Sequence, residues 1–437
     1  MFFYYCDLAW RSIKKTPMLS MLMVLAISIG IGITITTLNV YKTMSHNPAG
    51  DKSSQINSIQ LWSQGLDTWD DFHSNLTYTD VINLRNNNQL ELKAASYRTG
   101  LAVQSENPDI QPSLKSVRIT DRDFFNIFDV PFLYGQRWDK SVDTQPAYQV
   151  VIGETLNQTF FNGNNSVGET LYLNRKPYQI VGVIKDWNPQ PKYYDPTNGA
   201  FNDAEEIFIP FSLNEQEEFD VWGNTSGWRF EPMLTYQDRL NSEKTWIQFW
   251  TFLATDDDKS ELATWLTHYV EQQRNLGRFT DTAKSAAEAF QISDVALWLE
   301  NNDVVPRDNK ILVGLSVLFL SVCLVNILGL LLTKFLKRAP EVGVRRAIGA
   351  SRAQIFSQYM VEVGLIGFIG GIIGLLWAWG ALTVLHAEFN MEQSVTGLDS
   401  SMWIITPLIA ISTAVLAGVY PAWVVCRTKP SVYLKAQ

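Results

Sequence analysis

The chain has 437 residues, of which 46% are hydrophobic, 12% aromatic and only 18% charged, and its formal net charge is −9. This composition excludes a disordered chain, a fibre and a small disulfide-stabilised scaffold, and the length allows two or three domains. The mean hydropathy of −0.04 is an average over two kinds of segment. Long uncharged, apolar runs alternate with strongly acidic, polar segments. We therefore expect a membrane protein with a large water-exposed part.

Four uncharged runs of at least 23 residues predict transmembrane helices. At a rise of about 1.5 Å per residue, such a run reaches roughly 35 Å, which is enough to cross a hydrocarbon core of roughly 30 Å. The predicted spans cover residues 18–43, 311–333, 362–385 and 402–425.

Residues 1–17 are predicted to form a helix that lies in the cytoplasmic membrane interface. Phe2, Cys6, Trp10 and Ile13 fall on one helical face, and the charged side chains fall elsewhere. Pro17 marks the bend into the first span. Because the apolar run that follows is longer than the core of a signal peptide and no cleavage site follows it, we expect the first span to be retained.

The distribution of basic residues predicts the orientation. Twelve Lys and Arg residues stand in segments 1–17, 334–361 and 426–437, against only Asp7 and Glu341 within them and Glu362 directly after the second segment. By the positive-inside rule these segments, and therefore both termini, face the cytoplasm. Segments 44–310 and 386–401 then lie outside. The twelve residues are Arg11, Lys14, Lys15, Lys334, Lys337, Arg338, Arg345, Arg346, Arg352, Arg427, Lys429 and Lys435.

The external segment 44–310 contains 22 Lys and Arg against 38 Asp and Glu residues, which gives a net charge of −16. Binding of nucleic acid needs cations that neutralise phosphates, so this net charge argues against such a function. The segment contains no cysteine and must fold without disulfides. The four histidines of the chain show no metal-ligand spacing, and we expect no metal site.

Alternating short strands and helices predict an α+β fold for the external segment. A first module covers 51–120 and 229–305, and a β-rich insertion with many Gly, Asn and Pro residues covers 121–228. We expect a helix over 79–86 capped by Thr79, and a second helix capped by the aspartates at 256–258. The predicted strands are 56–62, 90–97, 114–120, 148–152, 170–173, 178–184, 206–210 and 246–252.

Ten of the fifteen tryptophans lie in this segment, and we expect most of them in its core. Binding of an apolar ligand or an adaptor protein is the alternative interpretation.

Motifs of catalysis and nucleotide binding are absent from the sequence. It contains no GxxxxGK[ST] loop, no GxGxxG after a predicted strand, no GxSxG elbow and no HExxH. Acidic pairs such as Asp70 with Asp71, or Glu205 with Glu206, are typical of an acidic surface. We expect neither a catalytic residue nor a bound cofactor in this chain.

The cytoplasmic segment 334–361 contains start and stop signals for a short helix. Pro340 suits the first turn, Arg345 and Arg346 complement the negative end of the helix dipole, and Gly349 stops the helix. Ser351 can cap the helix that follows. The helix and its flanks comprise Pro340, Glu341, Val342, Gly343, Val344, Arg345, Arg346, Ala347, Ile348, Gly349, Ala350 and Ser351.

Two interpretations of this segment stay open on the residues alone. One is a basic loop that fixes the topology and binds anionic lipid headgroups. The other is a surface helix that offers Val342, Val344, Ala347 and Ile348 for contact with a partner.

Small residues in the third span predict close helix packing. Gly367 with Gly371, and Gly370 with Gly374, give overlapping GxxxG spacings. Glu362 stands at the membrane boundary, where its carboxylate can reach water or an arginine, and a proton relay is the alternative role.

The sequence at 341–351, EVGVRRAIGAS, followed by Ile355, Glu362 and a glycine-rich span, resembles the signature of the FtsX/MacB family of ABC-transporter permeases. Segments 8–15 (LAWRSIKK) and 418–423 (GVYPAW) are similar to the same family. The external segment resembles the MacB-type periplasmic domain at 119–125, 135–137, 165–168, 178–183 and 207–210. The resemblance covers nearly the whole chain.

This resemblance implies a four-span α-helical membrane domain with a large α+β periplasmic domain between spans 1 and 2, in a bacterial inner membrane. It also implies a dimer, homomeric or with a related permease, in which residues 340–351 dock an ABC ATPase that binds ATP and Mg²⁺. In this mechanotransmission cycle, ATP moves the spans and the external domains. Because the chain starts at the interfacial helix, we expect the ATPase on a separate polypeptide.

The function implied is export of a peptide, drug or other amphipathic substrate. A periplasmic adaptor and an outer-membrane channel are further partners of this family. Two alternatives stay open: a lipoprotein-releasing permease of the LolC/LolE kind, and a signalling member that regulates a hydrolase or a sensor kinase.

Overall fold

The structure, a computed structural model, describes residues 2–63, 72–104, 111–280, 284–305, 307–389, 397–398 and 400–427. The predicted acidic pair Asp70 and Asp71, Trp69, half of the segment 386–401 and the end of the chain after Arg427 lie outside the described residues. The chain forms two compact units: a helical unit of residues 1–45 and 305–437, and a sheet unit of residues 46–304.

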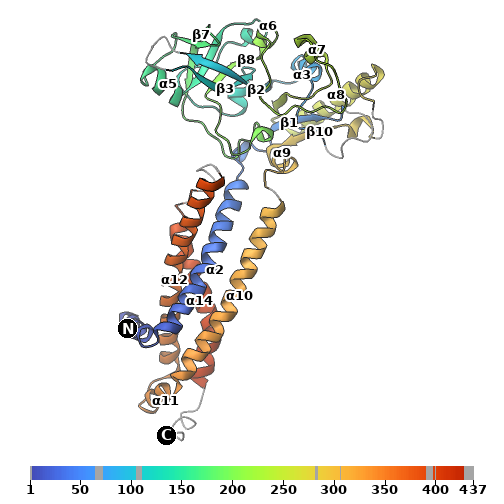
Figure 1. Cartoon of the computed structure of the whole chain (residues 1–437). Helices are drawn as coiled ribbons and strands as arrows, with labels where there is room; N and C mark the ends of the chain where they lie inside the picture. Colours follow the sequence, from blue (N-terminus) through green and yellow to red (C-terminus); the bar gives the residue numbers. More distant parts are fainter. Residues whose placement is uncertain are drawn as a thin grey trace. The chain divides into compact units, whose positions relative to one another are not determined.

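Four long helices run side by side in the helical unit (Figure 1). Among the described residues these four are long and apolar enough to cross a membrane, which confirms the predicted spans. They extend beyond the apolar runs: α12 has 38 residues and measures about 57 Å, longer than a hydrocarbon core of roughly 30 Å. The helices are α2 (Pro17–Met44), α10 (Arg307–Lys337), α12 (Arg352–Phe389) and α14 (Met402–Arg427).

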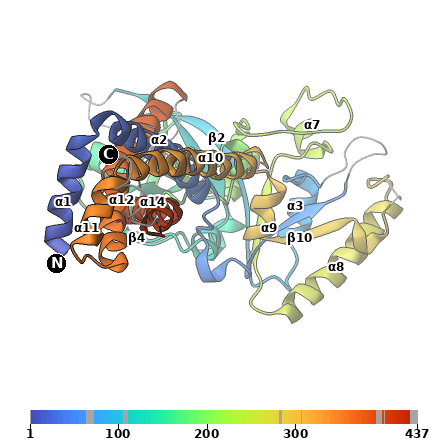
Figure 2. The ribbon, with the colours of Figure 1, turned by 90° about the horizontal axis from the view of Figure 1, so that it is seen from below.

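Two shorter helices, α1 (Phe2–Lys15) and α11 (Ala339–Ala347), lie at one end of this bundle (Figure 2). Helix α1 packs against α12 and buries Ala9 and Ser12, whereas Trp10 is exposed. Pro17 begins α2 directly after α1, at the predicted bend. Since proline has no backbone N–H to donate, the first turn of a helix accommodates it.

In the part of the sheet unit that the structure describes, ten strands form one mixed sheet. Its order is β10-β1-β9-β2-β3-β8-β5-β7-β4, and β6 pairs with both β2 and β7. The strands are β1 (Ile56–Leu61), β2 (Leu92–Gln104), β3 (Ser113–Thr120), β4 (Phe132–Gly135), β5 (Gln149–Gly153), β6 (Thr170–Leu173), β7 (Lys176–Ile184), β8 (Ile207–Pro210), β9 (Gln248–Phe252) and β10 (Phe290–Asp294).

The predicted insertion 121–228 shares this sheet with the first module. Strand β3 pairs in parallel with β8, with Arg118 opposite Phe208, and β2 pairs with β6 in antiparallel fashion. Strand pairing satisfies backbone groups that would otherwise be buried without a partner. The two segments are therefore joined by one continuous hydrogen-bond ladder.

Helices and 3-10 turns flank the sheet. The helices are α3 (Tyr78–Arg85), α4 (Phe124–Ile127), α5 (Glu154–Phe161), α6 (Asn214–Glu217), α7 (Tyr236–Asn241), α8 (Asp256–Asn275) and α9 (Val295–Asn301). The 3-10 turns are η1 (Gly50–Lys52), η2 (Lys140–Asp143), η3 (Pro196–Asn198), η4 (Phe211–Leu213) and η5 (Ala286–Glu288).

Two predicted helix caps are wrong by one or two residues. Thr77, not Thr79, caps α3, because its Oγ1 accepts the N–H of Asp80 at 3.1 Å. Thr255, not an aspartate, caps α8: its Oγ1 accepts the N–H of Asp258 at 3.2 Å, and the Asp258 carboxylate accepts the N–H of Thr255 at 2.9 Å. The aspartates occupy the first turn, where they complement the helix dipole.

Aromatic side chains fill the core of the sheet unit. Trp138, Trp246, Trp250 and Trp298 are at most 2% exposed, which places them in the core as expected. Trp222 is 41% exposed. Its ring lies against Gly100, where any Cβ would meet it at 2.1 Å.

Candidate functional site

Helix α11 is a defined helix with a stop signal at the expected glycine. It begins at Ala339, with Pro340 in its first turn. At its end, the N–H of Ala350 donates to the carbonyl of Arg345 at 3.0 Å, and the N–H of Gly349 donates to that of Arg346 at 3.2 Å. These two bonds form a Schellman motif, which requires the left-handed backbone that Gly349 adopts at φ +110°.

One side of α11 is buried and the other is open. Ala339, Val342 and Gly343 pack into the helical unit, so the prediction that Val342 is available for contact is wrong. Val344 and Ile348 are 48% and 82% exposed, and Ala347 is exposed as well. The period of the helix explains this division, because positions 339, 342 and 343 share one face.

Hydrogen bonds fix α11 to the neighbouring helices. Arg345 Nη1 donates to Gln358 Oε1 of α12 at 3.0 Å, and Arg346 Nη1 donates to the Cys426 carbonyl of α14 at 3.3 Å. Ser351 stands at the cap of α12: its Oγ accepts the Gln354 N–H at 3.2 Å, and Gln354 Oε1 accepts the Ser351 N–H at 3.0 Å. The bonds of Arg345 and Arg346 attach α11 to the start of α12 and to the end of α14.

A buried charge cluster, which we name the Glu362 cluster, lies beside α11. It comprises Ser12 of α1, Lys334 of α10, Arg338 between α10 and α11, and Glu362 of α12. Lys334 Nζ contacts Glu362 Oε1 at 2.7 Å, and both side chains are fully buried. Arg338 Nη1 contacts Glu362 Oε2 at 3.2 Å, and Ser12 Oγ donates to Glu362 Oε1.

The cluster extends to α2 and to α11. Lys334 Nζ also donates to Ser20 Oγ of α2 at 3.0 Å, and Arg338 Nη2 lies 3.7 Å from Glu341 Oε2 in the first turn of α11. Removing one partner of a buried ion pair costs about 3–5 kcal/mol, because the remaining charge is left uncompensated. The cluster thus holds α1, α2, α10 and α12 in one arrangement next to α11.

The Glu362 side chain is fully buried in the helical unit and has no contact with solvent. Of the two settings predicted for its carboxylate, water or an arginine, the structure shows the arginine, with Lys334 in addition. Cations face both carboxylate oxygens, which is the geometry of an ion-pair partner.

The four predicted glycines of α12 face two different helices. A Cβ at Gly367 or Gly371 would lie 2.7 Å from the Cβ of Ala414 or Ala410 of α14. A Cβ at Gly370 or Gly374 would meet α2, at 2.7 Å from Ile27 Cγ2 and 2.9 Å from the Ser28 carbonyl oxygen. Close backbone approach of this kind is how small residues stabilise membrane helices.

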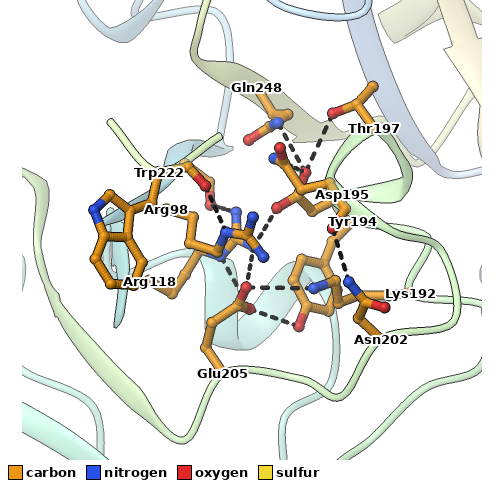
Figure 3. A network of polar contacts seen from close by, with 12 residues as sticks. Arg98, Arg118, Lys192, Tyr194, Asp195, Thr197, Asn202, Glu205, Trp222 and Gln248 are labelled. Atoms are coloured by element: carbon orange, nitrogen blue, oxygen red, sulfur yellow. Dashed lines mark hydrogen bonds and ion pairs between the residues drawn. The ribbon is translucent and has the colours of Figure 1, made fainter. Parts of the chain in front are cut away.

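A second buried charge cluster, the Arg118 cluster, lies in the sheet unit (Figure 3). Arg118 of β3 contacts Asp195 and Glu205, the latter at 2.7 Å, and Lys192 Nζ contacts Glu205 at 3.4 Å. Gln248 Nε2 of β9 donates to Asp195 at 3.0 Å. The cluster joins the chain between β7 and β8 to the sheet.

Glu205 is therefore not the surface residue that the sequence suggested. It is 4% exposed, and the Tyr194 hydroxyl donates to its Oε2 at 2.9 Å. Burial opposes ionisation, but attraction to Arg118 and Lys192 outweighs it and lowers the pKa of Glu205 to about 2. Only its neighbour Glu206 behaves as predicted, with a partly exposed pair to Lys115 at 3.4 Å.

Within the described ranges, no group of three or more His, Cys, Asp and Glu side chains has the geometry of a metal site.

Comparison with known proteins adds two family matches. Residues 20–264 match the model of a MacB-like periplasmic core domain, and residues 313–430 match that of an FtsX-like permease C-terminal domain.

Relatives resemble most of the chain. The macrolide export ATP-binding/permease protein MacB of Salmonella typhi is 22% identical over 374 residues, which cover 84% of this chain and 50% of that protein. The protein of the same name in Vibrio parahaemolyticus is 23% identical over 77% of this chain and 45% of its own length. The chain thus spans about half the length of the curated relatives it matches.

A solved structure of the periplasmic region of MacB from Actinobacillus actinomycetemcomitans is 13% identical, with a TM-score of 0.34. It covers 56% of this chain and 90% of the solved region.

Proposed function

Since the chain belongs to the family of permeases with a MacB-like periplasmic core domain and an FtsX-like C-terminal domain, we propose that it couples ATP hydrolysis by a separate ABC ATPase to movement of its sheet unit. The ATPase binds ATP and Mg²⁺, and this chain binds the ATPase through α11. A second permease, identical or related, completes the transporter.

One observation carries this proposal: α11 is anchored on one face and open on the other. Its exposed apolar residues Val344, Ala347 and Ile348 form a small surface between two spans. Such a surface on a short, capped helix suits insertion into a groove of a partner protein. A basic loop that served only to fix topology would need neither the Schellman motif nor the buried face.

The path from α11 into the membrane is continuous. Helix α12 runs without interruption from Arg352 to Phe389, so its first turns and its span are one rigid element. The ring centroids of Phe335 and Tyr359 lie 4.1 Å apart, which packs the end of α10 against the start of α12. The Glu362 cluster then distributes a displacement of α11 to α1, α2, α10 and α12.

In this proposal α11 and both termini lie in the cytoplasm and the sheet unit lies in the periplasm of a bacterial inner membrane. The distribution of basic residues supports this orientation. Export of an amphipathic substrate is the function that the relatives support, because their names describe macrolide export.

The docking role of α11 is tested by replacing Val344 and Ile348 with Asp. Two carboxylates without partners in an apolar contact are expected to lower recovery of the ATPase with the purified permease at least tenfold, because each must be desolvated. Membrane insertion should be unchanged, because both side chains lie on the exposed face. The matched control, Ile348→Leu, keeps an apolar side chain and should retain the ATPase. Full recovery with the double Asp variant would contradict the docking role.

A further inference from the structure

A large cavity in the sheet unit has no part in the coupling path described above. Its volume is about 1130 Å³, and its walls come from α3, β2, the turn after β3, η2, η4 and α6. Ligand cavities of drug-sized molecules measure roughly 300–1,000 Å³. The cavity is thus large enough for such a molecule, and it lies where the first module meets the insertion.

The lining of this cavity combines charged and apolar side chains. It contains five carboxylates and three basic side chains. One of the cations, Arg85, is held by Asp121 in a bidentate pair at 3.0 and 2.7 Å. Tyr78 and Ile82 of α3 are only partly buried and belong to the apolar lining, and Tyr78 stacks on Phe211 with ring centroids 6.4 Å apart.

Asp143 is held through one of its two oxygens, and that oxygen accepts two hydrogen bonds, whereas Glu215 accepts a single bond, from the Tyr78 hydroxyl. Asp143 Oδ1 accepts both the backbone N–H of Arg122 at 3.0 Å and the Trp138 Nε1–H at 3.1 Å. No donor among the described residues is bonded to Oδ2. Both bonds thus fix the carboxylate through one oxygen and leave the other for a ligand.

A carboxylate with a vacant acceptor in a cavity that also has apolar lining residues matches one class of ligand. An ammonium group donates to a carboxylate in a charge-assisted hydrogen bond, and an attached apolar body covers the aromatic and aliphatic surface. We propose that this cavity binds an amphipathic organic amine, with its ammonium group on Asp143 and its apolar body against Tyr78 and Ile82. That such an amine is transported rests on the proposed export function, whereas its binding does not.

The protonation of Asp143 gives this site a pH dependence. Burial raises the pKa of Asp143 to about 7, and the carboxylate of Asp121 adds to the rise. As the pH falls through about 7, the carboxyl group becomes neutral and loses its attraction for a cation. The charged groups that line the site or bond Asp143 are Arg85, Glu91, Lys93, Asp121, Arg122, Asp123, Lys140 and Glu215.

The test uses the full chain in detergent without any ATPase, and two fluorescent probes of similar shape. 2-(1-Naphthyl)ethylamine carries the ammonium group, and 2-(1-naphthyl)ethanol is its neutral counterpart. We expect the amine to bind saturably and about tenfold more tightly than the alcohol at pH 8, which corresponds to one charge-assisted hydrogen bond.

Asp143→Asn is the decisive variant, because an amide oxygen can still accept the two bonds to Oδ1 while the charge is lost. It should bind the amine about tenfold more weakly, leave the alcohol unchanged, and show less loss of amine binding between pH 8 and pH 6. The matched control is Asp139→Asn, an exposed position outside the cavity lining, which should behave as the wild type. Lys140→Gln removes a lining cation and should tighten amine binding severalfold.

Equal affinity of the wild type and Asp143→Asn for the amine would overturn the proposal, as would an equal loss in Asp139→Asn. Because no ATPase is present, these results do not depend on whether α11 docks one.

Discussion

The two buried charge clusters differ in their balance of charge and in what they join. The Arg118 cluster pairs two cations with two carboxylates, all nearly or fully buried, and ties one chain segment to a sheet. The Glu362 cluster pairs two cations with one buried carboxylate, and its Arg338 also reaches Glu341 at the start of α11. A buried cluster with equal numbers of cations and carboxylates suits a permanent connection between a chain segment and the sheet. An unbalanced cluster at the junction of several helices suits a joint that transmits movement.

The largest effect on stability is expected from the Arg118 cluster. Arg118→Met leaves Asp195 buried without a cation and should lower the free energy of unfolding by about 3–5 kcal/mol. Thermal unfolding followed by tryptophan fluorescence measures this loss. Lys52→Met, which breaks the exposed pair with Asp129, serves as the control and should cost at most about 1 kcal/mol. Equal losses of unfolding free energy in the two variants would contradict the distinction between buried and exposed ion pairs.

A smaller effect is expected where glycines, not charges, hold the helical unit together. Gly371→Ala would place a Cβ 2.7 Å from the Ala410 Cβ and 3.1 Å from the Pro407 Cα, and should cost about 1–3 kcal/mol. Gly380 lies in the same helix, and a Cβ added there would meet no atom of a neighbouring helix within 4 Å, so Gly380→Ala should be neutral or stabilising. Thermal unfolding in detergent compares the two. A destabilised Gly380→Ala would show that helix flexibility, and not packing, decides the result.

The local elements of both units could be predicted because their signals are contiguous. The four spans follow from uncharged runs, and strand β6 was predicted at its observed bounds because turn residues enclose it. The stop at Gly349 and the cap at Ser351 also depend on residues close in sequence. The predicted helix starts differ from the observed ones where several residues that can cap a helix stand close together, as Thr77 and Thr79 do at the start of α3.

The clusters could not be predicted, because their partners are distant in sequence. Glu205 looked like a surface residue until the sheet placed Arg118, 87 positions earlier, beside it. Ser12 and Glu362 meet across 350 positions. Val342 was misplaced for a similar reason: an amphipathic pattern does not say which apolar residues of a short helix face the protein and which face a partner.

The relay of movement from α11 to the spans is tested most directly by the distance between the far ends of α10 and α12. Ile311 and Val384 are exposed at these ends and can carry spin labels after Cys6, Cys323 and Cys426 are replaced by alanine. In the complex with the ATPase, double electron–electron resonance should show a shift of this distance on addition of ATP. Glu362→Gln removes the charge on which Lys334 and Arg338 converge, so it should retain the ATPase yet abolish the shift. An unchanged shift in Glu362→Gln would contradict the account.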